Sequence, residues 1–201
     1  MSKIKAIIFD WHGVLDKVKF ENMVKLLSEK STISLEDTKR ILKDECNERG
    51  YVTGVIETST FWRLVGERFH EENAQIAKEM ILSFSSNYGL WSVLPFLSSK
   101  YFLTILSDCP QDEVDTIKNI VNLSHYFKMY HFSSFIGKSK DDDAFFKMKD
   151  IGYKQEEMIY VDDNPKHIET ARRLGFKTFL FREQTVEEAE NFIKFCVYLE
   201  Q

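Results

Sequence analysis

The sequence contains few cysteines and no long apolar run. Cys46, Cys109 and Cys196 are the only cysteines among 201 residues; they are widely spaced and form no CxxC pair. This spacing argues against a disulfide framework or a zinc site and is typical of a protein of the reducing cytoplasm. The apolar stretch near the N-terminus is short and is interrupted by Asp10, so we expect neither a signal peptide nor a membrane span.

A basic surface suited to nucleic acid is also lacking. The formal net charge is −5, and acidic and basic residues are interleaved along the chain without a basic stripe. We therefore expect neither a nucleic-acid partner nor a membrane partner. The composition is otherwise that of an ordinary globular protein, with 43% hydrophobic and 29% charged residues. No feature of the sequence predicts an oligomeric state.

Strand-like and helix-like segments alternate along most of the chain, which is typical of a parallel sheet covered by helices. The first strand, Ile4–Phe9, is a continuous apolar run of the kind that is buried on both faces. The further predicted strands are Tyr101–Leu106, Met129–Phe132, Met158–Val161 and Thr178–Phe181. The helices predicted among them are Asp112–Asn122, Asp142–Asp150, Pro165–Leu174 and Val186–Leu199. We therefore predict an α/β fold with a parallel, Rossmann-like sheet.

Residues 17–87 interrupt this alternation and show helical periodicity instead. Apolar residues recur at helical spacing in Phe20–Leu27, Phe61–Phe69 and Ile76–Phe84. We predict a helical bundle inserted after the first strand, so that residues 1–16 and 88–201 form the sheet-containing core. The bundle is expected to cover one edge of the sheet, with hinges at Asp16–Lys17 and Asn87–Leu90.

Residues with chemical functions follow the predicted strands. Asp10 follows the first strand, Ser107 the second, and Asp162 and Asp163 the fourth, while Lys140 lies in the loop after the third. Ligands of open α/β sheets bind beyond the carboxyl ends of the strands. Three carboxylates gathered there would repel one another unless a divalent cation neutralised them, and oxygen-only ligands favour Mg²⁺. A carboxylate can also attack phosphorus to form an aspartyl-phosphate, while a lysine and a hydroxyl orient the phosphoryl group.

Four segments resemble the signature motifs of the haloacid dehalogenase (HAD) superfamily and occur in the order of that family. They are IIFDWHGVL, FLTILSD, GKSKDDDAFF and MIYVDDNPKHIETARRLGFKTFLF. The resemblance implies a Rossmann-like HAD core with an α-helical cap, Mg²⁺ as cofactor and a small phosphorylated metabolite as substrate. It implies that Asp10 is both nucleophile and metal ligand and that two carboxylates complete the metal site. In full, the implied site comprises Ser107, Asp108 and Lys140 for substrate and Asp10, Asp162 and Asp163 for metal.

His12 occupies the position at which phosphatases of this superfamily carry a second aspartate. That aspartate protonates the leaving alcohol and later activates water. An imidazole can do both because its pKa lies near neutrality, so we predict that His12 is the acid/base residue. Its main-chain carbonyl, which any residue can supply, would be a further metal ligand. Superfamily members with other residues here are dehalogenases, with Tyr, and phosphonate hydrolases, with Ala; the latter also need a Schiff-base lysine in the cap, which we cannot place.

Two alternatives to a phosphatase stay open. A chain without the second aspartate would keep the fold and bind phosphate and Mg²⁺ as a regulatory or binding protein. A dehalogenase-like hydrolase would use no metal, and the adjacent carboxylates Asp162 and Asp163 argue against it.

Trp11 adjoins the nucleophile and either faces the cap or packs in the core. The histidines without ligand spacing, expected to be structural or exposed, are His70, His125, His131 and His167.

Overall fold

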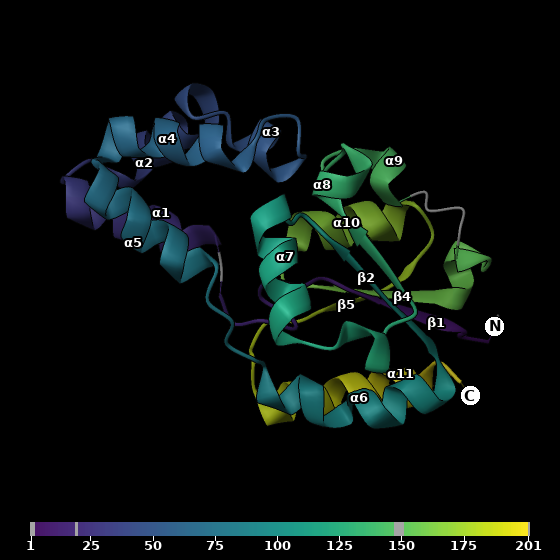
Figure 1. Cartoon of the computed structure of the whole chain (residues 1–201). Helices are drawn as coiled ribbons and strands as arrows, with labels where there is room; N and C mark the ends of the chain where they lie inside the picture. Colours follow the sequence, from purple (N-terminus) through teal and green to yellow (C-terminus); the bar gives the residue numbers. More distant parts are fainter. Residues whose placement is uncertain (1–2, 19, 147–150, 201) are drawn as a thin grey trace.

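The computed structural model describes residues 3–18, 20–146 and 151–200, which form a sheet-containing core and a helical cap (Figure 1). A five-stranded sheet with the order β3-β2-β1-β4-β5 forms the centre of the core. The strands are β1 (Ala6–Phe9), β2 (Phe102–Ser107), β3 (Met129–Phe132), β4 (Met158–Asp162) and β5 (Lys177–Leu180). All neighbouring strands pair in parallel, so the predicted α/β fold is confirmed.

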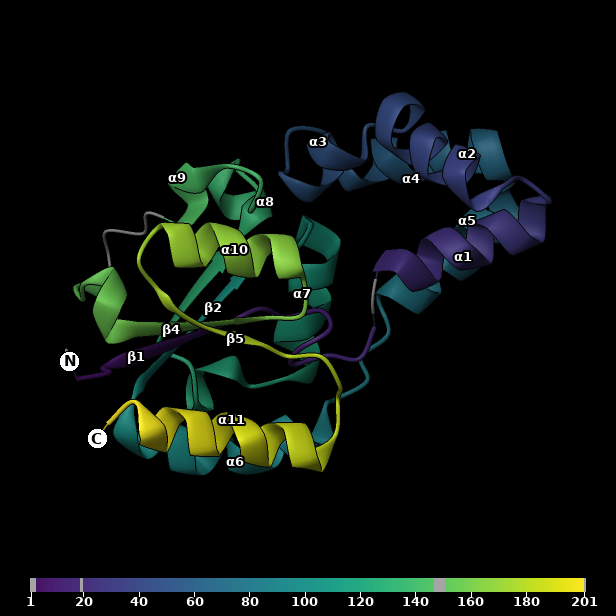
Figure 2. The same ribbon diagram turned by 180° about the vertical axis from the view of Figure 1, so that it is seen from behind.

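Every strand begins and ends within two residues of the bounds predicted from the sequence. The central strands β1 and β4 are buried along their whole length, because helices cover both faces of the sheet (Figure 2). One face packs against α6 (Tyr88–Lys100), α7 (Gln111–Ile120) and α11 (Val186–Tyr198). The opposite face packs against α10 (Pro165–Arg173). Continuous apolar strands of this kind are expected where both faces are covered.

Short helical segments flank β3. A 3₁₀ turn, Leu123–His125, precedes this strand, and α8 (Ser133–Ile136), α9 (Asp143–Phe146) and a second 3₁₀ turn, Gln155–Glu157, lie between β3 and β4. The helix α9 begins the segment predicted as helix Asp142–Asp150, of which residues 147–150 lie outside the described residues.

The helix α6 was not predicted from the sequence. Pro95 lies inside it, and apolar residues occur around most of its surface, so no amphipathic period marks the segment. It forms because its leucines are fully buried in the core; these are Leu90, Leu94 and Leu97. The side chain of Asn87 caps the first turn and also donates to the carbonyl of Val14 at 2.8 Å. Asn87 is thus anchored in the core, and the hinges at Asp16–Lys17 and Asn87–Leu90 stay predictions.

Among the described residues between β1 and α6, the cap comprises five α-helices. They are α1 (Phe20–Ser31), α2 (Leu35–Arg40), α3 (Glu48–Val52), α4 (Thr58–Phe69) and α5 (Glu71–Ile81), with a π-helical turn at Ile41–Glu45. The cap has an apolar core of its own, whose fully buried members include Met23, Leu27, Phe61, Val65 and Phe69. The two connections to the core run side by side, because Lys17 donates its backbone N–H to the carbonyl of Ser85 at 2.7 Å.

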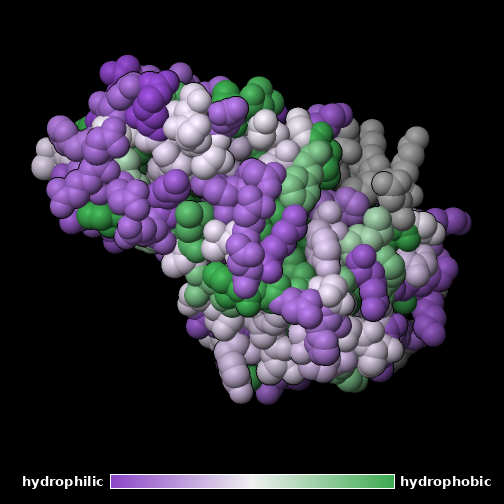
Figure 3. All heavy atoms as spheres, in the orientation of Figure 1, coloured by the Kyte–Doolittle hydropathy of each residue, from purple (hydrophilic) through white to green (hydrophobic). Residues whose placement is uncertain are grey.

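The cap and the core meet at α7 and α8. Tyr51 and Trp62 of the cap donate hydrogen bonds to the two carboxylate oxygens of Asp112, at 2.8 and 3.0 Å. Ser133 of α8 donates to the carbonyl of Val52 at 2.6 Å. On the face shown in Figure 3, hydrophilic residues cover most of the cap, and hydrophobic residues reach the surface in patches near its junction with the core. Among the described residues, no helix is long and apolar enough to cross a membrane.

Candidate active site

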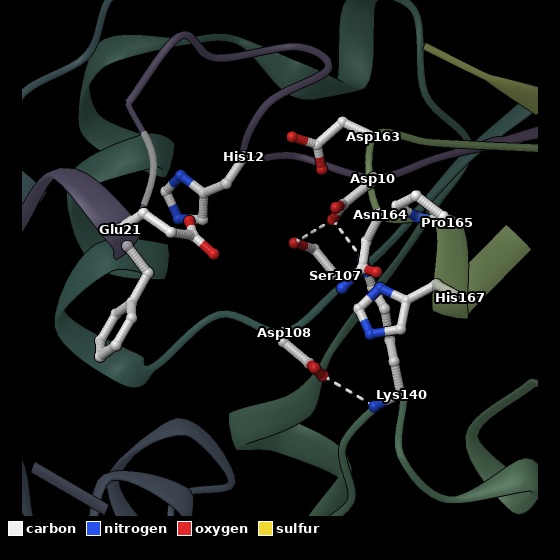
Figure 4. A pocket seen from close by; sticks show the side chains of 11 residues that line it. Asp10, His12, Glu21, Ser107, Asp108, Lys140, Asp163, Asn164, Pro165 and His167 are labelled. Atoms are coloured by element: carbon white, nitrogen blue, oxygen red, sulfur yellow. Dashed lines mark hydrogen bonds and ion pairs between the residues drawn. The ribbon is translucent and has the colours of Figure 1, made fainter. Parts of the chain in front are cut away.

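The predicted site residues lie together at the carboxyl edge of the sheet. Asp10 follows β1, Ser107 ends β2, and Asp162 ends β4. Phe9 pairs with Ile105 of β2 and with Val161 of β4, so the three strands end within two residues of one another. Figure 4 shows Asp10, Ser107, Lys140 and Asp163 directed at a common space. The polar side chains at the ends of three strands that are far apart in sequence therefore lie close together.

Asp10 is held by three hydrogen-bond donors. The hydroxyl of Ser107 and the backbone N–H of Trp11 each donate to its Oδ1 at 2.7 Å, and Lys140 Nζ lies 2.6 Å from the same oxygen. Asp10 is 6% exposed and Lys140 is 2% exposed. A buried carboxylate held by several donors has a fixed orientation, which a nucleophile needs for in-line attack.

Lys140 joins two buried carboxylates. Its Nζ contacts Asp10 and also Oδ2 of Asp162, at 2.8 Å. Tyr160 donates a hydrogen bond to Asp162, and Nδ1 of His167 lies 3.3 Å from the same carboxylate oxygen. The backbone N–H of Lys140 donates to Asp108 at 2.9 Å, which fixes the loop that carries the ammonium group. The cation therefore has a defined place between the two strand ends.

Burial and charge act in opposite directions on these groups. Burial raises the pKa of Asp10 to about 6, although the positive charge of Lys140 partly offsets this. Burial also acts to raise the pKa of Asp162, but Lys140 and His167 together hold it below its usual value. The pKa of Lys140 is raised, because its acidic neighbours outweigh the effect of burial. Lys140 is thus a permanent cation here.

Three carboxylates at this edge can hold a divalent cation. Oxygens of Asp10, Asp162 and Asp163 lie within 4.8 Å of one another. Gly13 permits this approach: it has φ +77°, and a Cβ at this position would lie 2.1 Å from Oδ2 of Asp163. A hard, all-oxygen donor set fits Mg²⁺. The main-chain carbonyl of His12 as a further ligand stays a prediction.

The imidazole of His12 has protein partners at both ring nitrogens. Nε2 lies 2.5 Å from Oε2 of Glu113, and Nδ1 lies 3.2 Å from the carbonyl of Val18 and 3.7 Å from Asp16. Burial acts to lower the pKa of His12, but the charge of Glu113 and the neighbouring hydrogen bonds raise it well above its usual value. For acid/base catalysis, one nitrogen must therefore exchange its present partner for substrate or water.

Cys109 lies close to this pair, with its Sγ 3.8 Å from Oε2 of Glu113. Ligand atoms of His12, Cys109 and Glu113 also lie within 4.8 Å of one another. Burial raises the pKa of the Cys109 thiol well above its usual range, which disfavours the thiolate that a metal would need. We therefore interpret this group as an ion pair with a neighbouring thiol.

The site opens into a cleft of about 470 Å³. Its walls include His12, Ser107 and Asp108 from the core and Phe20 and Glu21 from α1 of the cap. Asn164, the N-cap of α10, and Pro165 and His167 in its first turn form another wall, and Asp10, Lys140 and Asp163 also line the cleft. A cleft of this size, shared by core and cap, suits a small molecule.

Some residues at the site were missed or misjudged from the sequence. His167 was expected to be structural or exposed, but it lines the cleft and contacts Asp162. Its position two residues after Pro165, in the helix that follows the acidic pair, was the available signal. Glu113 was not singled out, because nothing in its local sequence marks it as a partner of His12. Trp11 is 1% exposed and stacks on Phe84, so the core alternative is correct for this residue.

Comparison with known proteins agrees with this geometry. The family model described as haloacid dehalogenase-like hydrolase matches residues 7–181. A HAD family enzyme of Bacteroides thetaiotaomicron, in complex with magnesium and inorganic phosphate, has 20% identity and a TM-score of 0.70, covering 88% of this chain and 93% of that one. A predicted HAD-like family hydrolase of Porphyromonas gingivalis has 20% identity and a TM-score of 0.72, with 96% and 99% coverage.

The fold is also similar to that of L-2-haloacid dehalogenase from Xanthobacter autotrophicus. That structure has 16% identity and a TM-score of 0.60, and the alignment covers 95% of this chain and 83% of that one. No match is found among curated proteins. Because the family model spans most of the sequence, and because the strand ends carry its polar residues, this chain belongs to the haloacid dehalogenase-like hydrolase family.

Proposed function

We propose that the chain is a Mg²⁺-dependent phosphohydrolase that acts on a small phosphorylated metabolite through an aspartyl-phosphate intermediate. The observation that supports this most directly is the position of Lys140 between Asp10 and Asp162, beside Ser107 and Asp163. A phosphoryl group needs a nucleophile, cationic and hydroxyl partners for its oxygens, and a carboxylate cluster that can hold a metal. All of these lie at one end of the cleft.

In the first half-reaction, a carboxylate oxygen of Asp10 forms a bond to phosphorus, and the bond from phosphorus to the leaving oxygen breaks. Lys140, Ser107 and Asp108 bind and orient the substrate during this step. Mg²⁺, when bound by Asp10, Asp162 and Asp163, supplies positive charge to the phosphoryl oxygens. In the second half-reaction, water attacks phosphorus, the bond to Asp10 breaks, and inorganic phosphate is released.

His12 is the acid/base group of this proposal. It gives a proton to the leaving oxygen in the first half-reaction and takes one from the attacking water in the second. Its place in the cleft wall beside Asp10 supports the assignment. Replacement of His12 by alanine is then expected to lower turnover by about two to four orders of magnitude, with a greater loss for an alkyl phosphate than for an aryl phosphate.

A second candidate function is phosphate and Mg²⁺ binding without turnover. The observation that favours it is the engagement of both His12 ring nitrogens by Glu113 and Val18. Activity that appears only in the variant His12→Asp would support this candidate. A metal-free dehalogenase is disfavoured because it has no use for the adjacent carboxylates Asp162 and Asp163.

The test is hydrolysis of p-nitrophenyl phosphate during a Mg²⁺ titration, followed by a panel of phosphorylated metabolites. Metal-dependent turnover by the natural chain, absent in the isosteric variant Asp10→Asn, is the expected result. Binding of Mg²⁺ and phosphate by calorimetry without turnover would replace the proposal by the binding function. Release of halide from a 2-haloacid without metal would replace it by dehalogenation.

We further propose that the protein acts in the cytoplasm and without nucleic-acid or membrane partners. The free cysteines Cys46, Cys109 and Cys196 are all buried, which suits a reducing compartment. Fractionation of cells that produce the chain tests this proposal.

A further inference from the structure

Glu113 is an unusual buried residue in the first turn of α7. It is 4% exposed, and its carboxylate lies 2.5 Å from His12 Nε2, although the two residues are 101 positions apart in the sequence. A buried carboxylate is costly unless it is paired. Replacing such an ion pair by well-packed apolar residues is often neutral or stabilising, so stability alone does not account for its presence.

The two ring nitrogens of His12 have different partners. Nε2 contacts the carboxylate of Glu113 at 2.5 Å, whereas Nδ1 contacts the main-chain carbonyl of Val18 at 3.2 Å and lies 3.7 Å from the carboxylate of Asp16. Val18 lies in the connection between the core and the cap, immediately before the part of the cap that contributes Phe20 and Glu21 to the cleft. The contact to Glu113 is the shortest of these and is made inside the core.

We propose that Glu113 is a positioning residue that holds Nε2 of His12 and so directs Nδ1 to exchange the Val18 carbonyl for a substrate oxygen or water. This inference rests on the proposed function, in which His12 acts on the leaving group. A carboxylate that binds one nitrogen of an imidazole fixes the ring and leaves the other nitrogen to act, as in other histidine sites of proteins. Glu113 itself does not touch the substrate.

The kinetic test uses Glu113→Gln, which keeps the size of the side chain and removes its charge. With Mg²⁺ present, kcat for an alkyl phosphate is expected to fall about 10- to 100-fold, the usual effect of removing a group that orients an active residue, with KM nearly unchanged. Turnover of p-nitrophenyl phosphate, whose leaving group needs little protonation, is expected to fall much less. In a His12→Ala background, the same substitution is expected to have no further effect.

Asp115→Asn is the matched control, because Asp115 lies on the same helix, is exposed and bonds only to Gln111 among the side chains described. It is expected to leave both activities unchanged. Equal losses on the two substrates for Glu113→Gln, or an effect that adds to that of His12→Ala, would show a merely structural role and overturn the inference. Glu113→Asp, which withdraws the carboxylate by one methylene, provides a second variant if Glu113→Gln does not fold.

A measurement independent of turnover separates this inference from the proposed function. Nuclear magnetic resonance of ¹⁵N-labelled histidine, assigned with His12→Ala, should show a strongly hydrogen-bonded Nε2–H in the natural chain. That signal should be lost in Glu113→Gln while the melting temperature stays close to the natural value. If the natural chain is inert with Mg²⁺, the proposed function fails, and the resonance still decides whether Glu113 holds the ring. An unchanged resonance in Glu113→Gln would refute the inference.

Discussion

Replacement of Asp112 by alanine is expected to loosen the contact between the cap and the core. Its Oδ1 accepts a hydrogen bond from Tyr51 at 2.8 Å, and its Oδ2 accepts one from Trp62 at 3.0 Å. Both donors belong to nearly buried side chains, which are 3% and 7% exposed, so the substitution leaves two buried donors without their acceptor. A hydrogen bond to a charged group contributes about 1.5–3 kcal/mol. Because Asp112 is only half-buried and water can replace it in part, we expect a loss of about 2–4 kcal/mol.

The assay is urea unfolding followed by tryptophan fluorescence and circular dichroism. Tyr51→Phe removes one of the two donors and is expected to cost about 1 kcal/mol. Asp115→Ala makes the same change on the exposed side of α7 and is expected to stay within about 0.5 kcal/mol of the natural chain. Amide exchange should accelerate in α3 and α4 but not in β1, since the two lost contacts belong to the cap.

An Asp112→Ala variant as stable as Asp115→Ala would refute this reasoning. Equal acceleration of amide exchange in the cap and in the sheet would also refute it, because the destabilisation would then not be confined to the contact between cap and core. A stability loss in Asp112→Ala that is no larger than that of Tyr51→Phe would show that Trp62 finds water as a substitute partner.

Three further predictions concern the carboxyl edge of the sheet. Lys140→Met leaves two buried carboxylates without their cation. This variant should lower the free energy of unfolding by about 3–5 kcal/mol at pH 8 and abolish turnover. Equal stability of the variant and the natural chain in urea unfolding would contradict this. The pKa of Asp10 is raised from 3.8 to about 6, so the folded state binds more protons than the unfolded state in this window. Without metal, stability relative to Asp10→Asn should therefore fall by about 2 kcal/mol as the pH rises from 4 to 6, and saturating Mg²⁺ should reduce the fall. Gly13→Ala should weaken Mg²⁺ binding in calorimetry and should destabilise the fold more than Gly152→Ala. Both glycines have a positive φ, but only the Cβ added at Gly13 would clash with the side chain of Asp163.

The sequence by itself determined the sheet and the residues at its edge. Continuous apolar runs such as Ile4–Phe9 predicted strands that are buried on both faces, and Met129–Phe132 is a strand with the predicted bounds. The fold class then placed Asp10, Ser107 and Asp162 together, because the carboxyl ends of parallel strands meet at one edge. These inferences succeeded because each depends on local periodicity and on a general rule of chain topology.

Only the tertiary structure decided which side chains contact one another across the fold. The partner of His12 is Glu113, 101 positions later, and Asp112 contacts Tyr51 and Trp62, 61 and 50 positions earlier. No local pattern encodes such pairs, because they depend on how the cap and α7 pack against the sheet. The helix α6 escaped prediction for a related reason: packing against the core stabilises it, rather than an amphipathic repeat of its own.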